Sequence, residues 1–380
     1  MSRSRKPEVI VVRSNSITHD VRVQKIIRTL SKKYKVLVLG WNRENRFGDF
    51  EINAQGAQIK RLKLKAPYGH ISLLLYMPVF WIWVIINLVL LKPKVIHACD
   101  LDTLIPCLIF KLFYRKVKVV FDSFERYAMA FILPTNIFSK LLFNLVFILE
   151  NILAMKSDAL IVTSEERLRT FGAFVPKYKI IVMNTPEDLL NEVLKIKDKK
   201  IKKRPEEFLI IYAGGVAKWR GILLLKKAIE DLENVRLVIA GRIIDVSLNE
   251  LIEDPKIQYL GILSHKEALA LMSQADVIPI LYDPKFIISR YANPNKLYEA
   301  MMLGVPVLSN VCKNIIKKIG CGIIINYNAN DIREALIFLK ENINLRKQMG
   351  LKGRIAFKKE YEWNIMEKRI EKLYFQLLSR

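Results

Sequence analysis

Cysteine and histidine are scarce in this chain of 380 residues, which contains four of each. The cysteines, Cys99, Cys107, Cys312 and Cys321, include no Cys-x-x-Cys pair and no Cys/His spacing typical of a metal site. A disulfide framework and a structural zinc site are therefore excluded as the basis of the fold. We expect reduced thiols, a cytoplasmic location and no bound metal.

Acidic residues are also few, because 37 of them stand against 62 basic residues, which gives a net charge of +25. Residues 1–185 hold 29 basic and 13 acidic residues, so the excess leans toward the N-terminal half. Such an excess attracts nucleic acid, anionic lipid or phosphorylated ligands. No nucleic-acid recognition motif occurs, so we expect no nucleic-acid partner. A Lys/Ile-rich genome composition is an alternative source of part of the excess.

We expect no signal peptide, because the stretch MSRSRKPEVIVV has no long apolar segment before a cleavage site. One uncharged run, Ile71–Leu91, is long enough to span a membrane. A spanning helix would separate the strands that flank it, so we predict a helix packed on a sheet, with Trp81 and Trp83 available to a membrane surface. A fully buried core helix is the alternative. Cations that fit anionic headgroups flank the run at Lys60–Lys65, Lys92 and Lys94.

Short apolar strands alternate with helical segments along most of the chain, which predicts α/β architecture with doubly wound parallel sheets. The first half runs from the strand EVIVV to IIVMNTP, and the alternation restarts at FLIIYAGG after a basic connector. We expect two Rossmann-like domains, residues 1–186 and 207–360, joined by the connector 187–206. Residues 361–380 are expected to form an amphipathic helix that returns to the N-terminal domain.

The segment NPNKLYEAMMLGVPVLSN, residues 293–310, predicts a loop, a helix, a turn and a buried strand. Pro294 suits the first turn of a helix and Gly304 can end it. Residues three apart share a helix face, so Lys296 and Glu299 point the same way at an end that attracts anions. An ordinary surface ion pair is the alternative.

A second candidate lies at YAGGVAKWRG, where Gly214 and Gly215 follow a strand and Lys218 and Arg220 begin the next helix. Glycines let the backbone approach a phosphate, and a guanidinium binds phosphate with two hydrogen bonds. The turn IAGR, which ends at Arg242, repeats the arrangement after the next strand.

The order of these pieces resembles the retaining, GT-B-fold glycosyltransferases of family 4 over nearly the whole chain. The segments THDVRVQKII, KVIHACDLDT, VVFDSFE and SDALIVTSEE resemble their first domain. The segments YAGGVAKWRG, LVIAG, YLGILSHKEALALMSQADVIPIL and PNKLYEAMMLGVPVLS resemble their second domain, in order and spacing.

The resemblance implies two domains that face each other across a cleft and a metal-independent transfer of a sugar from a nucleotide donor, with retention. It places Glu299 on the ribose hydroxyls and cationic groups on the departing diphosphate. The implied catalytic residues are Glu125, Lys296 and Arg220. The implied donor-binding residues are Gly214, Gly215, Lys218, Arg242, Tyr291, Asn293, Asn295, Leu297 and Glu299. The implied acceptor-side residues are His19, His97, Asp100, Asp122 and Phe124.

The expected partners are UDP-, GDP- or another nucleotide sugar, a lipid-linked or glycan acceptor, and an anionic membrane surface at the cytoplasmic face of the cell membrane. The sequence departs from the family at four positions: Cys99 and Phe124 replace histidines, Tyr291 replaces a glutamate and Gly215 an arginine. These departures leave open a catalytically impaired partner subunit. A GT-B sugar-nucleotide epimerase is a further alternative, although histidines for acid–base chemistry are few.

Three residues have simpler interpretations. Asp20 is expected to cap the first helix rather than act in catalysis. His97 is as compatible with a buried, hydrogen-bonded role as with a site. His265 is expected to start a helix away from the chemistry.

Overall fold

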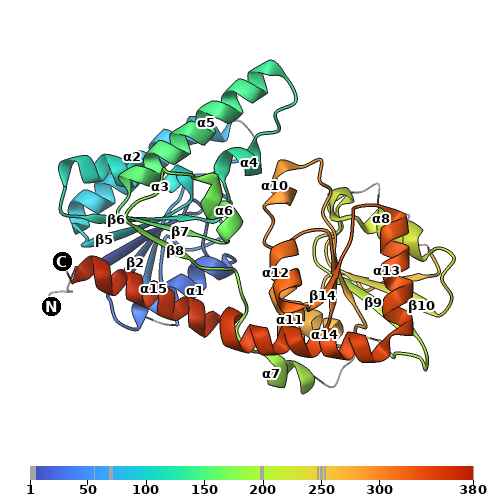
Figure 1. Cartoon of the computed structure of the whole chain (residues 1–380). Coiled ribbons are helices and arrows are strands. Elements are labelled where there is room, and N and C mark those ends of the chain that lie inside the picture. The colour runs from blue at the N-terminus through green and yellow to red at the C-terminus, as the bar shows by residue number, and fades with distance from the viewer. Residues whose placement is uncertain are drawn as a thin grey trace. The chain divides into compact units, whose positions relative to one another are not determined.

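The computed structural model describes residues 6–54, 56–67, 72–196, 201–245, 248, 251 and 254–379. Ile71, where the apolar run was expected to begin, and residues 197–200 of the predicted connector lie outside the described residues. The chain divides into unit 1, Met1–Met183 with Met366–Arg380, and unit 2, Asn184–Ile365. The division falls inside the last helix, α15 (Trp363–Leu378), which is red in Figure 1.

Unit 1 is built on an eight-stranded sheet in the order β3-β4-β2-β1-β5-β6-β7-β8. All neighbours are parallel except β3 and β4. Parallel sheets covered on both faces favour continuous apolar strands, and β1 is buried along its whole length. The strands are β1 (Val9–Val12), β2 (Val36–Trp41), β3 (Phe50–Ile52), β4 (Gln58–Leu62), β5 (Val95–Cys99), β6 (Lys118–Ser123), β7 (Ala159–Val162) and β8 (Tyr178–Ile181).

The edge strand β3 and its neighbour β4 are not predicted by the sequence, which indicates only a cationic flank at Lys60–Lys65. Exposed and buried residues alternate in β4, so its apolar signal is weak. Arg61 points inward, with its side chain fully buried against Glu51 and the carbonyls of Ser16 and Gly48. A buried arginine cannot be distinguished from a surface cation by composition.

Helices cover both faces of this sheet (Figure 1): α2, α3 and α5 on one face, and α1 and α15 on the other. The core under α2 and α3 joins Phe80, Val84 and Leu104 to alternate residues of the strands, such as Ile10 and Ile96. The helices of unit 1 are α1 (Val21–Ser31), α2 (Leu73–Leu91), α3 (Leu101–Phe113), α4 (Tyr127–Phe131), α5 (Ile137–Lys156) and α6 (Glu165–Thr170).

Two of these helices, α2 and α5, are long and apolar enough to cross a membrane, and only 28% and 17% of their most apolar stretches are buried. The alternative of a fully buried α2 is therefore wrong. Trp81 and Trp83, predicted to be available to a membrane surface, are only partly exposed, because both pack against the core and Trp81 donates a hydrogen bond to the Asp102 carbonyl. A spanning α2 does not fit the sheet either, since the strands before and after it, β4 and β5, belong to one sheet.

Unit 2 contains two three-stranded parallel sheets, β11-β10-β9 and β12-β13-β14, linked by a bridge between Ile210 and Val277. Helices α8 and α13 supply apolar side chains to a core with β9 and β10. The strands are β9 (Phe208–Ala213), β10 (Val235–Ala240), β11 (Ile257–Tyr259), β12 (Ile278–Ile280), β13 (Val307–Ser309) and β14 (Gly322–Ile324). The helices are α7 (Leu190–Leu194), α8 (Ile222–Ile229), α9 (His265–Met272), α10 (Ile287–Arg290), α11 (Asn295–Leu303), α12 (Lys313–Ile319), α13 (Ala329–Glu341) and α14 (Ile343–Ala356).

The segment predicted as a connector contributes to unit 2. It contains α7, and Asp188 pairs with Arg354 at 2.7 Å and with Lys358 at 3.0 Å. These cations lower the pKa of Asp188 to about 2 through hydrogen bonds, chiefly from Arg354. These ion pairs hold the stretch to the rest of unit 2, although its polar sequence predicts a linker.

Candidate functional site

The carboxyl end of β9 leads into a close backbone turn at Gly214. This glycine has φ of 145°, and a Cβ atom there would overlap the ammonium group of Lys296. Its N–H donates to the carbonyl of Ala240, which ties the end of β9 to the end of β10. Gly241 follows β10 with φ of 137°, and a Cβ there would overlap the Gly214 carbonyl. Only glycines allow these two turns to approach so closely.

Arg220 lies in η1, a short 3-10 turn at Lys218–Arg220, and is enclosed by aromatic rings. Its guanidinium carbon lies 3.9 Å from the ring centre of Trp219 and 4.3 Å from that of Tyr282. It also donates a hydrogen bond to the Tyr282 hydroxyl. Guanidinium stacking on aromatic faces fixes the charge while leaving other donors free to bind an anion.

Lys296, in the first turn of α11, extends over the ring of Tyr212, with Nζ 4.7 Å from the ring centre. Burial lowers the pKa of Lys296 to about 8, and the charge of Arg220 acts in the same direction while Glu299 opposes it. Two cations that disfavour each other's charge without an anion are typical of a site that binds one. No ion pair joins Lys296 to Glu299 among the described residues, so the surface ion-pair alternative is wrong.

Glu299 lies one turn further along α11, with its side chain only 15% exposed. Its carboxylate is 3.1 Å from Nε2 of His265, the first residue of α9. The prediction that His265 starts a helix is confirmed, but the prediction that it lies away from the site is wrong. The sequence interval between the two residues gave no signal, because α9 and α11 meet only through the tertiary fold.

The start of α11 is open to an anion. Pro294 occupies the cap position without a side-chain hydrogen bond to the first turn, and Asn295 there is exposed. Asn293 accepts a hydrogen bond from the hydroxyl of buried Tyr298 at 2.6 Å, so it positions the loop. The structure does not support Leu297 as a donor-binding residue, because its side chain is fully buried and its N–H donates to the Pro294 carbonyl.

Four further residues are predicted to bind the donor: Lys218, Arg242, Gly215 and Tyr291. The side chains of Lys218 and Arg242 are exposed, and their backbones are held by Asp245 and Val216 respectively. The carbonyl of Gly215 accepts a hydrogen bond from the Tyr212 hydroxyl at 2.6 Å. Tyr291 is half-buried in the segment before α11.

Unit 1 has its own polar cluster where β1 and β5 end. Arg13 pairs with Asp20 at 2.9 Å and with Asp100. Asp20 also accepts from the N–H of Val23, which confirms its predicted cap role. Asp100 has φ of 70°, an unfavourable value for a residue other than glycine, and accepts from the N–H of Phe124 at 2.9 Å.

The Phe124 ring lies near two arginines of this cluster, 4.5 Å from the guanidinium carbon of Arg13 and 4.8 Å from that of Arg22. Arg22 binds Asp122 at 2.7 Å, and both side chains are buried. Burial would raise the pKa of Asp122, but Arg22 and His97 together lower it. The segment THDVRV carried a usable signal for Arg22, which was missed.

Of the two interpretations of His97, the structure supports the buried, hydrogen-bonded role over a residue of an open site. It is fully buried, with Nε2 3.2 Å from Asp122 and Nδ1 2.7 Å from the hydroxyl of Tyr374 in α15. His19 is exposed and packs on Phe47, away from these contacts. The structure thus brings together His97, Asp100, Asp122 and Phe124, of which His97 and Asp122 are fully buried, whereas in the described part of the chain His19 makes no hydrogen bond or ion pair with them.

Glu125 follows Phe124 and has a side chain 43% exposed, paired with Arg167 of α6. The carboxylate is therefore accessible and beside a cation. In the described part of the chain, no group of three or more His, Cys, Asp or Glu side chains is arranged to hold a metal ion.

These units define a fold class, the GT-B fold, and comparison with known proteins agrees. Residues 195–355 match the family model described as "Glycosyl transferases group 1". An uncharacterized glycosyltransferase of Methanocaldococcus jannaschii is 24% identical over 201 residues, which span 48% of this chain and 49% of that relative.

Two solved structures match nearly the whole chain. Sucrose-phosphate synthase from Thermosynechococcus elongatus is 13% identical, with a TM-score of 0.76 over 98% of this chain and 99% of the other. Anabaena HepE, solved in complex with UDP and glucose, is 11% identical, with a TM-score of 0.70 over 97% and 99%. The predicted fold class is confirmed.

Proposed function

We propose that this chain transfers a sugar from a nucleotide sugar to a lipid-linked or glycan acceptor. The observation that carries the proposal is the placement of Lys296 and Arg220 beside the glycine turn at Gly214 and the open start of α11. Backbone N–H groups, a guanidinium and an ammonium are the donors that bind a diphosphate. The carboxylate of Glu299 supplies an acceptor for the ribose hydroxyls.

The cations also fit the chemistry of the leaving group. As the bond between the anomeric carbon and the diphosphate breaks, negative charge grows on the departing oxygen. Fixed positive groups stabilise this charge more than that of the intact donor, which lowers the barrier without a metal. Arg220 is held by its aromatic neighbours and needs no reorganisation during the step.

The proposed donor is a UDP-sugar, a GDP-sugar or another nucleotide sugar. HepE supports uracil, since that protein was solved with UDP and glucose. The acceptor is proposed to bind unit 1 near Glu125, Asp100 and Arg13, where an exposed carboxylate and a cation can contact sugar hydroxyls. Retention of the anomeric configuration is part of the proposal and rests on the resemblance to family 4.

The test is turnover of a panel of nucleotide sugars by the purified protein, measured as release of nucleoside diphosphate with membrane lipid extracts as acceptors. We expect release from donors of one base, and loss of release in Lys296→Ala. No release from any donor, despite nucleotide binding, would favour the catalytically impaired subunit. Nuclear magnetic resonance of the product identifies its anomeric configuration, and an inverted product would contradict retention.

A further inference from the structure

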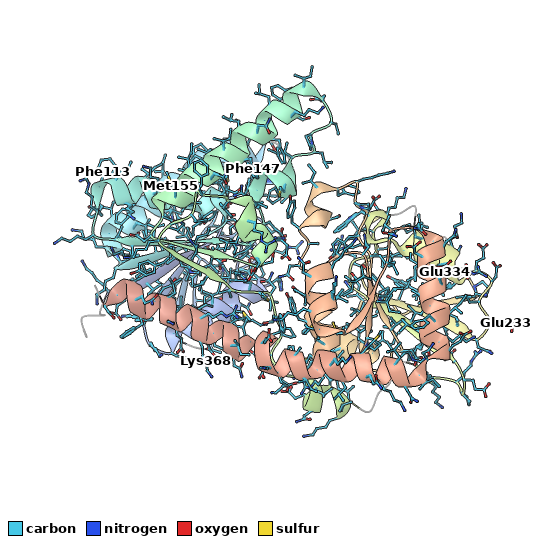
Figure 2. All side chains as sticks on the ribbon, viewed as in Figure 1. Phe113, Phe147, Met155, Glu233, Glu334 and Lys368 are labelled. Carbon is cyan, nitrogen blue, oxygen red and sulfur yellow. The ribbon has the colours of Figure 1, made fainter. Side chains whose placement is uncertain are left out.

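Unit 1 carries exposed apolar side chains on three neighbouring helices and on the segment that follows α4. Helix α3 packs against both α2 and α5 on one face of the sheet. Phe113 is 80% exposed, Ile137 87%, Phe138 75% and Leu141 66%. Figure 2 shows Phe113, Phe147 and Met155 on the same side of unit 1, where they belong to α3 and α5. We call the outer face of α2, α3 and α5 the apolar surface.

Packing within unit 1 buries few of the side chains of helix α5. Its buried residues are Glu150, Asn151 and Ala154, so none falls in the first 13 of its 20 residues. These turns are apolar and capped by a reciprocal hydrogen-bond pair between Asn136 and Ser139. A helix that is well formed but apolar on its solvent side marks an interaction surface.

The exposed charges within residues 72–156, which include the apolar surface, are mainly basic. Of the acidic residues in 72–156, Asp102, Asp122 and Glu150 are buried, while Asp100 and Glu125 pair with Arg13 and Arg167. The exposed basic residues of the same segment are Lys92, Lys94, Arg115, Lys116, Lys140 and Lys156, of which Lys94 pairs with Glu8 at 2.9 Å. A partner must therefore offer both apolar groups and negative charge.

A hollow at the rim shows the same chemistry. It has a volume of about 860 Å³ and lies beside the ends of α2, α3 and α15. Its lining combines cations, Lys92, Arg115 and Lys116, with apolar side chains, Phe110, Phe113 and Leu377. The described part of the chain offers no carboxylate partner to Arg115 or Lys116. Such a hollow fits an anionic headgroup above an acyl chain.

We propose that the apolar surface lies in the interface of an anionic bilayer, with α5 inserted among the headgroups and the cations of the rim on lipid phosphates. Apolar helices flanked by cations bind membranes in this orientation. A second copy of the chain is disfavoured as the occupant, because its identical rim would bring like charges together. A spanning arrangement is disfavoured by the sheet, since α5 connects β6 and β7, which are paired along their length.

The test is cosedimentation of the purified full chain with vesicles of equal parts phosphatidylglycerol and phosphatidylcholine, or of phosphatidylcholine alone. We expect binding to the anionic vesicles that weakens with added salt, because exposed charges are screened. The triple variant Ile137→Ser, Phe138→Ser, Leu141→Ser should lower the partition coefficient on the order of 1000-fold, since each of the three burials contributes ~10-fold. Arg115→Glu with Lys116→Glu should abolish the preference for anionic lipid.

Matched controls exist on α14 of unit 2. Ile343, Leu351 and Ile355 are 53%, 60% and 58% exposed, and the triple serine variant there should bind vesicles as the wild type does. Lys347→Glu with Lys352→Glu matches the charge reversal on exposed lysines of the same helix. Unchanged melting temperatures show that each variant folds.

Four results would overturn the proposal. The first is wild-type protein that remains in the supernatant at low salt, and the second is an α5 variant that binds vesicles as the wild type does. A dimer that the α5 variant abolishes, without vesicle binding, would assign the surface to a second copy. Resistance to alkaline carbonate extraction would indicate a spanning helix. The assay needs no nucleotide, so its outcome is independent of the proposed transfer reaction.

Discussion

At the scale of single residues, the site in unit 2 depends on two cations held in place before any anion arrives. Arg220 is fixed between Trp219 and Tyr282, and Lys296 lies over Tyr212. Each placement removes a cation from water, which costs solvation free energy. Attraction to an anionic ligand offsets this cost. The ordinary fate of lysine is a solvated surface position, so these contacts are what set the two residues apart.

The protonation of Lys296 gives a pH prediction. Because burial lowers its pKa to about 8, the ammonium is charged below this value and becomes neutral above it. Affinity for a nucleoside diphosphate should therefore fall as pH rises from about 7 to about 9. Lys296→Arg keeps the charge and should flatten this dependence. Calorimetric titrations across this range decide, and a wild-type affinity that does not vary with pH would contradict the role of Lys296.

Glu299 and His265 give a second prediction. Glu299→Gln should weaken nucleotide binding about 10- to 100-fold, because a hydrogen bond to a charged group contributes ~1.5–3 kcal/mol. His265→Ala removes a group that orients the carboxylate, so its effect should be smaller and absent in the Glu299→Gln background. Glu341→Gln, an exposed change in the same unit, is the control. Additive losses in the double variant would show that His265 acts independently of Glu299.

At the scale of elements, the site is made by turns that follow β9 and β10 and by the first turn of α11. The strands bring these turns to one edge because their carboxyl ends point the same way. Gly214 leaves room for the side chain of Lys296, because a Cβ atom at position 214 would overlap its ammonium group. The turn therefore sets the position of the cation.

Replacing Gly214 with alanine should displace Lys296 and weaken diphosphate binding at least about 10-fold, as loss of a charge-assisted contact does. Gly261→Ala is the matched control. Its φ of 68° also disfavours alanine, but no atom lies within 4 Å of the added carbon. Both variants are compared by calorimetry and thermal unfolding. Equal binding losses would assign the effect to backbone strain alone.

Sequence patterns predicted the elements with continuous apolar runs, such as β1, β9 and α11, and the shared direction of Lys296 and Glu299. They did not predict β4, because a polar strand with a buried arginine has no apolar period. They also failed where a partner came from a distant element, as with His265 and Glu299. Side-chain partners across elements depend on packing, which periodicity does not encode.

At the scale of the whole molecule, the C-terminal segment Met366–Arg380 belongs to unit 1 although it follows unit 2 in the chain. Tyr374 is fully buried and bonds His97, which bonds Asp122, which binds Arg22. The final helix thus supplies a hydrogen-bond partner to the polar cluster of unit 1. Stability of that cluster should depend on the last residues of the chain.

Tyr374→Phe should lower the free energy of unfolding by about 1–3 kcal/mol, because it leaves a buried nitrogen of His97 without its partner. Phe375→Leu, on the exposed side of the same helix, should change it by less than about 0.5 kcal/mol. Urea denaturation measures both. An unaffected Tyr374→Phe variant would mean that His97 finds another partner.

The most direct test of the central claim is calorimetric titration of the wild type and Arg220→Ala with nucleoside diphosphates and with the corresponding nucleosides. The account predicts that one diphosphate binds the wild type and binds Arg220→Ala about 10- to 100-fold more weakly, since a charged contact contributes ~1.5–3 kcal/mol. The nucleoside should lose little affinity. Equal losses for diphosphate and nucleoside, or no binding of any nucleoside diphosphate by the wild type, would contradict it.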